Sequence, residues 1–367
     1  MRPLPLIAAI LVASACAAPG GGAPSSTTSV LAASPTPVSV VTVTPATAAP
    51  TVTGATPAPT LAPQTLTITE FKVGAGQGPH DVAPAADGGV WYTAQRTGEL
   101  GYLDPKTGAY RMIKLGAGSS PHGVIVGPDG SPWVTDSGLN AIVRVDPISS
   151  EIARYQLPGP NVNLNTAAFD RFGTLWFTGQ SGYYGYVRIR HTSQESDEVK
   201  VFLSPRGAGP YGITSASHGN GNIYYASLAG SHIAMVDIKE AVASPIDSPT
   251  KDQGARRIWE DSKGDLWVSE WNAGQVGRYN PTSKQWKEWK LPGPNPMTYA
   301  VYVDDQDIVW LTDFGANAIV RFDPRTETFT SLPHAAANAA VRQLIGRPGE
   351  VWGAMSGQDK LLVVRTR

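Results

Sequence analysis

From residue 66 onward, apolar runs of four to six residues alternate with polar turns that contain Gly, Asp, Asn and Pro. Runs of this length between turn residues are typical of β-strands and are too short for ordinary helices. The stretch 121–157 is representative, because it holds four such runs and three turns. We expect its strands at Gly123–Val126, Pro132–Asp136, Ala141–Val145 and Ile152–Leu157.

This four-strand unit repeats along the chain around a Gly-x-x-Trp or related tetrad. The aromatic anchors are separated by 42, 43, 48, 43, 43 and 42 residues. A period in the low forties with four strands per unit indicates a propeller blade, so we predict an all-β, seven-bladed β-propeller of four-stranded antiparallel blades. A two-sheet sandwich, the alternative, does not predict a fixed spacing. The anchors are Trp91, Trp133, Trp176, Tyr224, Trp267, Trp310 and Trp352.

The seventh unit ends before it has room for a fourth strand. Its third strand is predicted at Leu361–Arg365, two residues from the end of the chain. An uncovered strand would expose unpaired backbone groups. The alternating segment 66–73 precedes the first blade and is the candidate partner. We therefore expect it to pair with the last blade and to close the ring without a covalent bond.

The first 65 residues differ from the rest, because after Arg2 they contain no charged side chain and no aromatic ring. Residues 1–16 combine one positive charge, a short apolar run and small residues, which is the pattern of a secretory signal. The small residues lead into Cys16 and resemble a bacterial lipobox, so we expect lipidation at Cys16; the alternative is ordinary secretion. We predict that residues 17–65 form a disordered spacer and that residues 66–367 form the propeller.

Composition excludes several classes of function. The formal net charge is −1, from 29 basic and 30 acidic residues, so no broad positive field is available for nucleic acid. Cys16 is the single cysteine, which excludes an internal disulfide and CxxC chemistry. We expect an extracytoplasmic monomer that touches the membrane only through a lipid anchor.

Candidate chemistry lies where the innermost strands begin. The position eleven residues before each anchor, thirteen in the fourth unit, faces the axis in the predicted propeller, and six of the seven residues there can form hydrogen bonds. The second strand returns to the same face and adds three carboxylates, which makes a polar concave site. The alternatives are a merely solvated channel, or an Arg256–Glu270 pair with no further role. The axial residues are His80, His122, Asn165, Tyr211, Arg256, Tyr299 and Val341, and the carboxylates are Asp136, Glu270 and Asp313.

The residues directly after the axial positions are expected to point in a different direction from the axial residues. Side chains alternate along a strand, so Arg257 and Arg342, each one residue further on, should point away from the axis. The tryptophan anchors should lie in the core.

The repeated units resemble those of streptogramin B lyases, the virginiamycin B lyase family. The resemblance rests on Pro-His-Gly-Val, Asp-Gly, Trp-Val-Thr-Asp and Asn-Ala-Ile-Val-Arg in 121–144, and on the related run in 264–278. It implies a seven-bladed propeller that opens a cyclic depsipeptide lactone by elimination, with a catalytic His, nearby Glu and Mg²⁺. His80 and His122 match the Pro-His motif. They occupy the first two blades, whereas the family's histidines occupy the last two.

Three hypotheses follow for the function. In the first, the chain is a lyase-like enzyme with His80 or His122 as base and Arg256 as clamp for the developing negative charge. The second is a non-catalytic propeller that binds a sugar, peptide or anionic ligand in its channel. The third is a calcium-dependent lactonase, which usually has six blades. A scaffold that binds partners at its rim is also left open. In the first hypothesis, Asp136 and Glu270 act as acid or metal-holding groups, and Asp313, Asn165, Tyr211 and Tyr299 contact the substrate.

Overall fold

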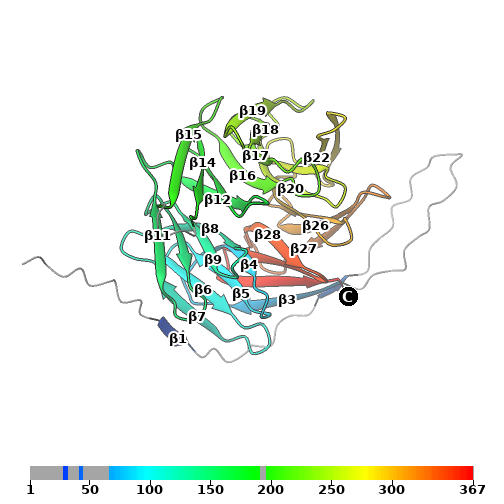
Figure 1. Cartoon of the computed structure of the whole chain (residues 1–367). Coiled ribbons are helices and arrows are strands. Elements are labelled where there is room, and N and C mark those ends of the chain that lie inside the picture. The colour runs from blue at the N-terminus through cyan, green and yellow to red at the C-terminus, as the bar shows by residue number, and fades with distance from the viewer. Residues whose placement is uncertain (1–27, 32–40, 44–65, 191–195, 367) are drawn as a thin grey trace, which may run out of the picture.

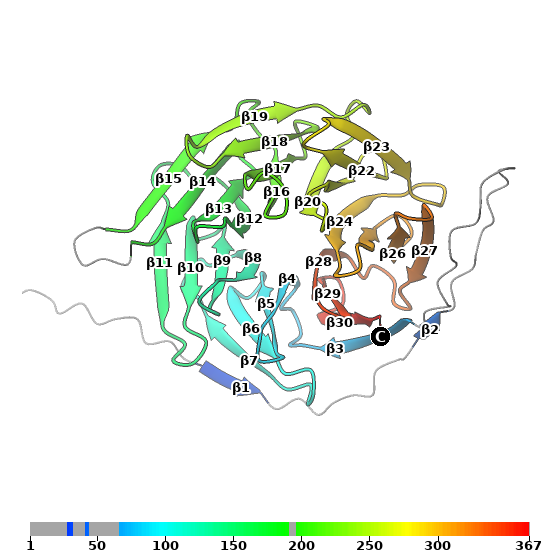
Figure 2. The same cartoon turned by 45° about the vertical axis from the view of Figure 1, so that its right-hand side comes forward.

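The computed structural model describes residues 28–31, 41–43, 66–190 and 196–366. Seven antiparallel sheets surround a central axis, and the innermost strand of each sheet faces that axis (Figures 1 and 2). The predicted all-β, seven-bladed propeller is confirmed. The described residues contain no helix of a length and apolar character suited to crossing a membrane. The predicted signal and Cys16 lie outside the described residues.

The blades follow one another in chain order, and each runs from an inner strand to an outer one. Blade 1 holds β4 (Pro79–Pro84), β5 (Val90–Ala94), β6 (Glu99–Leu103) and β7 (Tyr110–Lys114). Blade 2 holds β8 (Pro121–Val126), β9 (Pro132–Asp136), β10 (Ala141–Val145) and β11 (Ile152–Gln156). Blade 3 holds β12 (Leu164–Phe169), β13 (Leu175–Gly179), β14 (Tyr183–Arg188) and β15 (Glu198–Leu203). Blade 4 holds β16 (Pro210–Ser215), β17 (Ile223–Ser227), β18 (His232–Asp237) and β19 (Val242–Ile246).

The remaining three blades complete the ring. Blade 5 holds β20 (Ala255–Glu260), β21 (Leu266–Glu270), β22 (Gln275–Asn280) and β23 (Gln285–Lys290). Blade 6 holds β24 (Thr298–Val303), β25 (Val309–Asp313), β26 (Ala318–Asp323) and β27 (Thr328–Pro333). Blade 7 holds β28 (Val341–Arg347), β29 (Glu350–Met355), β30 (Lys360–Arg365) and, as its fourth strand, β3 (Leu66–Lys72).

The ring closes as the sequence predicts. Strand β3 pairs antiparallel with β30, in a register that runs from Thr67 opposite Arg365 to Lys72 opposite Lys360. Figure 2 shows the first and last strands of the propeller side by side near the C-terminus. A salt bridge of 2.7 Å between Lys360 and Glu70 joins the same two strands. Closure therefore rests on backbone pairing and packing between the two ends of the domain.

Two short strands lie within the segment predicted to be a spacer. Strand β1 (Thr28–Leu31) pairs with β7, and β2 (Val41–Val43) pairs with β3. Each adds a fifth strand at the rim, on blade 1 and on blade 7 respectively. Both strands fall within residues 17–65, for which the sequence predicts a disordered spacer. Their backbone groups complete an outer edge that would otherwise be open.

The anchors lie between the blades, where the sequence places them. Trp91, Trp176, Trp267, Trp310 and Trp352 are among the largest fully buried side chains of the described residues. A carboxylate in the first turn of the blade accepts the indole N–H in several units, for example from Trp267 to Asp261 at 2.9 Å and from Trp310 to Asp304 at 2.8 Å. The anchor therefore packs its ring and satisfies its one polar atom at the same time.

Hydroxyl groups connect neighbouring blades around the axis. Thr93 donates a hydrogen bond to the backbone carbonyl of His122 at 2.8 Å, and Ser269 donates to that of Tyr299 at 2.6 Å. Thr135 bonds to the carbonyl of Asn165 in the same way. Each hydroxyl lies two residues after an anchor, and each acceptor is the axial residue of the next blade. These bonds hold the axial residues in a defined ring.

All seven innermost strands carry a β-bulge at their start. The register between each inner strand and its neighbour shifts at the axial position, for example between Pro79 and Val82 and between Ala255 and Arg257. The other five blades show the same shift. A bulge re-aims side chains and interrupts their strict alternation. Two consecutive residues of one strand can therefore face the axis together.

Candidate functional site

Six of the seven axial residues meet at one mouth of the channel. The rings of His80 and His122 lie 3.9 Å apart between centroids, and the hydroxyl oxygens of Tyr211 and Tyr299 lie 2.5 Å apart. Asn165 and Arg256 contact members of these two pairs. His80 is 3% exposed and His122 is 5% exposed. Residues from six blades therefore form one buried cluster, which we call the axial cluster.

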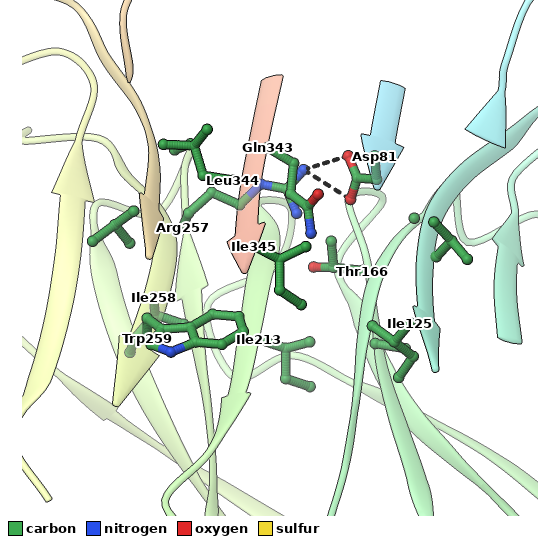
Figure 3. Close-up of a pocket in the computed structure, with 15 residues that line it drawn as sticks. Asp81, Ile125, Thr166, Ile213, Arg257, Ile258, Trp259, Gln343, Leu344 and Ile345 are labelled. Atoms are coloured by element: carbon green, nitrogen blue, oxygen red, sulfur yellow. Dashed lines mark hydrogen bonds and ion pairs between the residues drawn. The ribbon is translucent and has the colours of Figure 1, made fainter. Parts of the chain in front are cut away.

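His80 is oriented by a series of hydrogen bonds that crosses the channel. Its Nδ1 lies 2.8 Å from Oδ1 of Asp81, and Nη2 of Arg257 donates to the same carboxylate at 3.1 and 3.3 Å. Figure 3 shows the Arg257–Asp81 ion pair between the inner strands. Because a carboxylate accepts and does not donate, the Nδ1 of His80 carries the proton. Its Nε2 therefore keeps a lone pair.

His122 has the same tautomer, with its proton on Nδ1, but its ring is held at the other nitrogen. Its Nε2 lies 3.3 Å from the amide nitrogen of Asn165, which donates to it. The proton of the neutral ring is then on Nδ1, which is buried and has no hydrogen-bond partner among the described residues. The two adjacent imidazoles thus offer one acceptor nitrogen and one donor nitrogen.

Burial and nearby arginines keep both imidazoles neutral. Desolvation lowers the pKa of His80 well below its usual 6.5, and Arg257, Arg342 and Arg256 lower it further. Desolvation also lowers the pKa of His122, with repulsion from His80 as the second cause. For Asp81, burial raises the pKa although the adjacent Arg257 opposes this. A neutral imidazole with a free lone pair is the form that a general base requires.

Arg256 is held by aromatic rings. Its guanidinium carbon lies 3.6 Å from the ring centroid of Tyr299, 4.5 Å from that of Trp271 and 4.7 Å from that of Tyr211. Its Nη2 donates to the hydroxyl of Tyr211 at 3.0 Å. Phe314 stacks on Tyr299 at 4.9 Å. A cation against aromatic faces gains electrostatic attraction from the rings.

The expectation for Arg257 and Arg342 is wrong. Arg257 is 6% exposed and bonds to Asp81 in the axial cluster, and the guanidinium carbon of Arg342 lies 5.9 Å from the ring centroid of Tyr299. For Arg257 the bulge at the start of the inner strand is the physical reason, because it turns consecutive side chains to the same side. For Arg342 the reason is the register of blade 7: Trp352 pairs with Ile345, seven residues earlier, whereas Trp91 pairs with Ala83, eight residues earlier. Arg342 therefore takes the axial place, and Val341 packs in the core. Asp81, Trp271 and Phe314 also belong to the site, although the sequence did not predict them there. The sequence signal for Asp81 and Arg257 is a charged residue directly after an axial position.

The three predicted carboxylates do not join the axial cluster. Asp136 accepts from the backbone N–H groups of Ser120 and Leu139, and Asp313 accepts from those of Met297 and Gly315. Both therefore organise their own loops. Glu270 accepts from Nε2 of Gln275 at 2.6 Å, and its other oxygen has no described partner. The pair between Arg256 and Glu270, considered from the sequence, is not formed.

Burial of Glu270 leads to a prediction about stability. Desolvation raises its pKa from 4.5 to about 8, so the folded protein keeps this carboxyl protonated at pH values where the unfolded chain has lost the proton. The raised pKa means that its stabilising contribution is complete below pH 4.5 and is lost as the pH rises through 8. We expect Glu270→Gln to raise the free energy of unfolding at pH 7 by on the order of 3 kcal/mol.

Urea unfolding at pH 4.5 and at pH 7 measures this effect. At the lower pH the variant and the parent should have similar stability. Glu99→Gln is the matched control, because Glu99 is a partly exposed glutamate that begins the third strand of blade 1. Equal stability of Glu270→Gln and the parent at pH 7 would contradict the prediction.

A pocket lies in the channel on the other side of the Asp81–Arg257 ion pair. Asp81, Arg257, Gln343 and Thr166 line its polar end, and its remaining lining is largely apolar (Figure 3). The space between protein atoms at this pocket is about 470 Å³, part of which is open to solvent. The ion pair therefore separates the axial cluster from an apolar part of the channel. The apolar lining includes Ile125, Ile213, Ile258, Trp259 and Ile345.

One group of possible metal ligands exists among the described residues. Ligand atoms of His80, Asp81 and His122 lie within 4.8 Å of one another. Mg²⁺ prefers oxygen ligands in octahedral geometry, whereas this group offers two nitrogens and one carboxylate that already binds Arg257. Two further arginines add positive charge around it. The donor set therefore does not fit the Mg²⁺ that the family resemblance implies.

Fold and site together define a seven-bladed propeller with buried, titratable side chains at one mouth of its channel. The chain belongs to the virginiamycin B lyase family, whose family model matches residues 66–362. No curated protein matches the chain in sequence. Similarity to known proteins therefore comes from the family model and from solved structures.

The solved structures support the same fold. A streptogramin B lyase matches with a TM-score of 0.74 and 21% identity, over 82% of this chain and 98% of that chain. Virginiamycin B lyase from Staphylococcus aureus matches with a TM-score of 0.74 and 20% identity, over 82% and 99%. A chain described as an extracellular domain of a two-component system from B. thetaiotaomicron matches with 0.65 and 14%, over 82% and 43%. At these identities the likeness establishes the fold alone.

Proposed function

We propose that this chain is an extracytoplasmic lyase that opens a cyclic ester or lactone by elimination. The observation that carries the proposal is the hydrogen-bonded series of Arg257, Asp81 and His80, which leaves the Nε2 of His80 unprotonated beside His122. The oriented, neutral imidazole of His80 can act as a base, and the adjacent imidazole of His122 can donate a hydrogen bond in the same site. A catalytically inactive His-to-Ala variant of the S. aureus relative, solved with quinupristin, supports a histidine-dependent reaction.

In the proposed reaction, His80 takes a proton from a carbon next to a carbonyl. The electron pair of that C–H bond forms a carbon–carbon double bond as the neighbouring C–O bond of the ester breaks, and the oxygen leaves as a carboxylate. The Nδ1–H of His122 is free to donate a hydrogen bond to the departing oxygen. Asp81 keeps His80 in the required tautomer. Without the Asp81 carboxylate, the imidazole ring of His80 would no longer be held in this orientation.

The arginines supply positive charge where negative charge develops. The guanidinium carbons of Arg256 and Arg342 lie 3.6 and 5.9 Å from the ring centroid of Tyr299, and both arginines lower the pKa of His80. Preorganised cations in a water-poor site stabilise an enolate and a carboxylate strongly. The proposed mechanism therefore uses guanidinium groups for charge stabilisation and assigns no step to Mg²⁺. Asn165, Tyr211 and Tyr299 shape the site around the substrate.

The proposed location rests on the N-terminal sequence. A secretory-type signal followed by Cys16 and a Pro- and Thr-rich segment supports export, with lipidation at Cys16 as an anchor. A solved neighbour described as an extracellular domain agrees with this location. Metabolic labelling with a fatty-acid analogue, compared between the parent and Cys16→Ser, tests the anchor.

The activity can be tested with two cyclic depsipeptide lactones of the streptogramin B type, one neutral and one bearing a free carboxylate. Elimination produces a linear product of unchanged mass with a new double bond, whereas hydrolysis adds one water. We expect the linear, unsaturated product, detected by its shifted retention and new ultraviolet absorbance. We also expect EDTA to leave the rate unchanged, because the donor set of the axial cluster does not fit Mg²⁺.

Two outcomes would overturn the lyase. If neither lactone is opened by the parent chain, and if His80→Ala and His122→Ala only bind the lactones more weakly, the chain is a binding propeller. A product that has gained water would identify a hydrolase instead. Loss of activity in EDTA, restored by Mg²⁺, would keep the elimination and overturn the metal-free mechanism.

A further inference from the structure

Three arginines surround a single aromatic ring in the axial cluster. The guanidinium carbons of Arg256, Arg257 and Arg342 lie 3.6, 6.0 and 5.9 Å from the ring centroid of Tyr299. They come from the bulged starts of the inner strands β20 and β28, on blades 5 and 7, which flank β24 of blade 6 with Tyr299. Three cations therefore share a space only a few side chains wide.

The positive charge in this space exceeds the negative charge. Asp81 is the one carboxylate that bonds to these arginines among the described residues, and the two histidines are neutral. Three guanidinium groups and one carboxylate give a net charge of +2 by formal count. A buried excess of charge is costly unless a counter-charge accompanies it.

Several buried donors of the cluster also lack acceptors. The Nε–H groups of Arg256 and Arg257 and the Nδ1 of His122 are buried without a hydrogen-bond partner among the described residues. The Arg257 side chain is more than nine-tenths buried and lines the channel. Buried donors are normally satisfied, so these three indicate an acceptor that arrives with a ligand.

We infer that the axial cluster is a carboxylate-binding site formed by Arg256, Arg257 and Arg342, and that the substrate of the proposed lyase carries a free carboxylate. The second half of this inference rests on the proposed function, whereas the first half does not. A planar carboxylate accepts two parallel hydrogen bonds from a guanidinium fork, and it brings one negative charge into a site that lacks it.

A carboxylate suits this site better than a phosphate dianion. The cluster is almost closed to solvent, with Tyr299 and His80 1% and 3% exposed, so the ligand group must lose its water. Removing water from a doubly charged group costs more than removing it from a single charge. Asp81 also remains in the cluster and repels the higher charge. The small monoanion is therefore the better match.

Acetate is the probe, and the full chain can be tested without any substrate. Calorimetric titration and thermal unfolding with sodium acetate, against sodium chloride at equal ionic strength, separate specific binding from salt screening. We expect saturable binding of acetate with a rise in melting temperature. Sodium phosphate forms a second arm, and tighter binding of phosphate than of acetate through the same arginines would overturn the carboxylate assignment.

Two variants should change the affinity in opposite directions. Arg342→Gln removes one positive charge and should weaken acetate binding by roughly tenfold or more. Asp81→Asn removes the single negative charge and should tighten it. Arg144→Gln is the matched control, because Arg144 forms an outward salt bridge with Asp129 and its loss should leave acetate binding unchanged. If Asp81→Asn fails to fold, Arg342→Gln and Arg342→Lys still test the site.

The outcomes separate this inference from the proposed reaction. Acetate binding that depends on Arg342, with no lactone opened, supports the site and overturns the lyase. The reverse result is that both lactones are opened equally fast and that acetate does not inhibit the reaction. This result supports the lyase and overturns the carboxylate-binding site. Absence of saturable acetate binding in the parent chain and in Asp81→Asn also overturns it.

Discussion

Replacement of His80 by alanine is expected to lower kcat/KM for lactone opening by about 10²–10⁴, the usual contribution of a general base. The reason is geometric: His80 is the imidazole whose Nδ1 binds Asp81, so its Nε2 keeps the lone pair that takes the proton. His80→Gln is the second variant, because the amide can still donate to Asp81 while it cannot act as a base. Initial rates with the two lactones measure the effect.

The pH profile is an independent test of the same residue. Burial and neighbouring arginines lower the pKa of His80, so the imidazole stays neutral as the pH falls through its usual value of 6.5. We therefore expect kcat/KM to remain level across neutral pH and to fall only below pH 6.5. A fall that begins above this pH would show that another group limits the reaction.

His218→Ala is the control for these measurements. The side chain of His218 is 59% exposed in blade 4, and its Nδ1 lies within hydrogen-bond distance of Glu260, outside the axial cluster. Its loss should leave the rate unchanged. If His80→Gln retains full activity while the protein is folded, His80 is not the base, and His122→Gln becomes the next variant to test.

Replacement of Ile68 by aspartate is expected to open the propeller. Ile68 lies in β3, the strand that closes the ring, and it belongs to a buried cluster with Trp310, Leu332 and Val364 of the last two blades. Loss of its packing together with burial of a charge should destabilise the domain by on the order of 4 kcal/mol or more. Urea unfolding and light scattering measure the loss of stability and the aggregation that an exposed strand edge promotes.

Thr67→Asp is the control on the same strand. Thr67 is adjacent to Ile68 and points to the other face, where it is only half-buried, so a charge there should cost much less. Similar losses for the two variants would mean that the effect comes from the backbone of β3. Unchanged stability of Ile68→Asp would show that closure does not depend on this strand's packing.

The periodic part of the molecule could be predicted from the sequence. Trp267 and Trp310 recur at a fixed spacing because each blade needs one large side chain between two sheets, and this requirement is local to a blade. Closure by segment 66–73 followed from counting strands, because the seventh blade lacked one. The axial positions of His80 and His122 followed from the same register.

The charges of the site could be predicted only in part. Arg257 and Asp81 are 176 residues apart and meet across the channel because blades 1 and 5 face one common axis. Strict alternation would place both away from that axis, and the bulge in each inner strand overrides it. Glu270 shows the opposite error. The sequence predicts its carboxylate at the mouth of the channel, whereas its side chain bonds to Gln275 within its own blade.

The sequence alone determined what repeats: strand lengths, turns, the number of blades, the anchors and the residues at the start of each inner strand. These features depend on local spacing and on burial within one blade, which a single chain records directly. Only the tertiary structure decided which side chains meet at the axis, which imidazole keeps its lone pair and where positive charge exceeds negative charge. Those outcomes depend on distances of a few ångströms between different blades, and they change when one bulge turns a side chain from the sheet face to the channel.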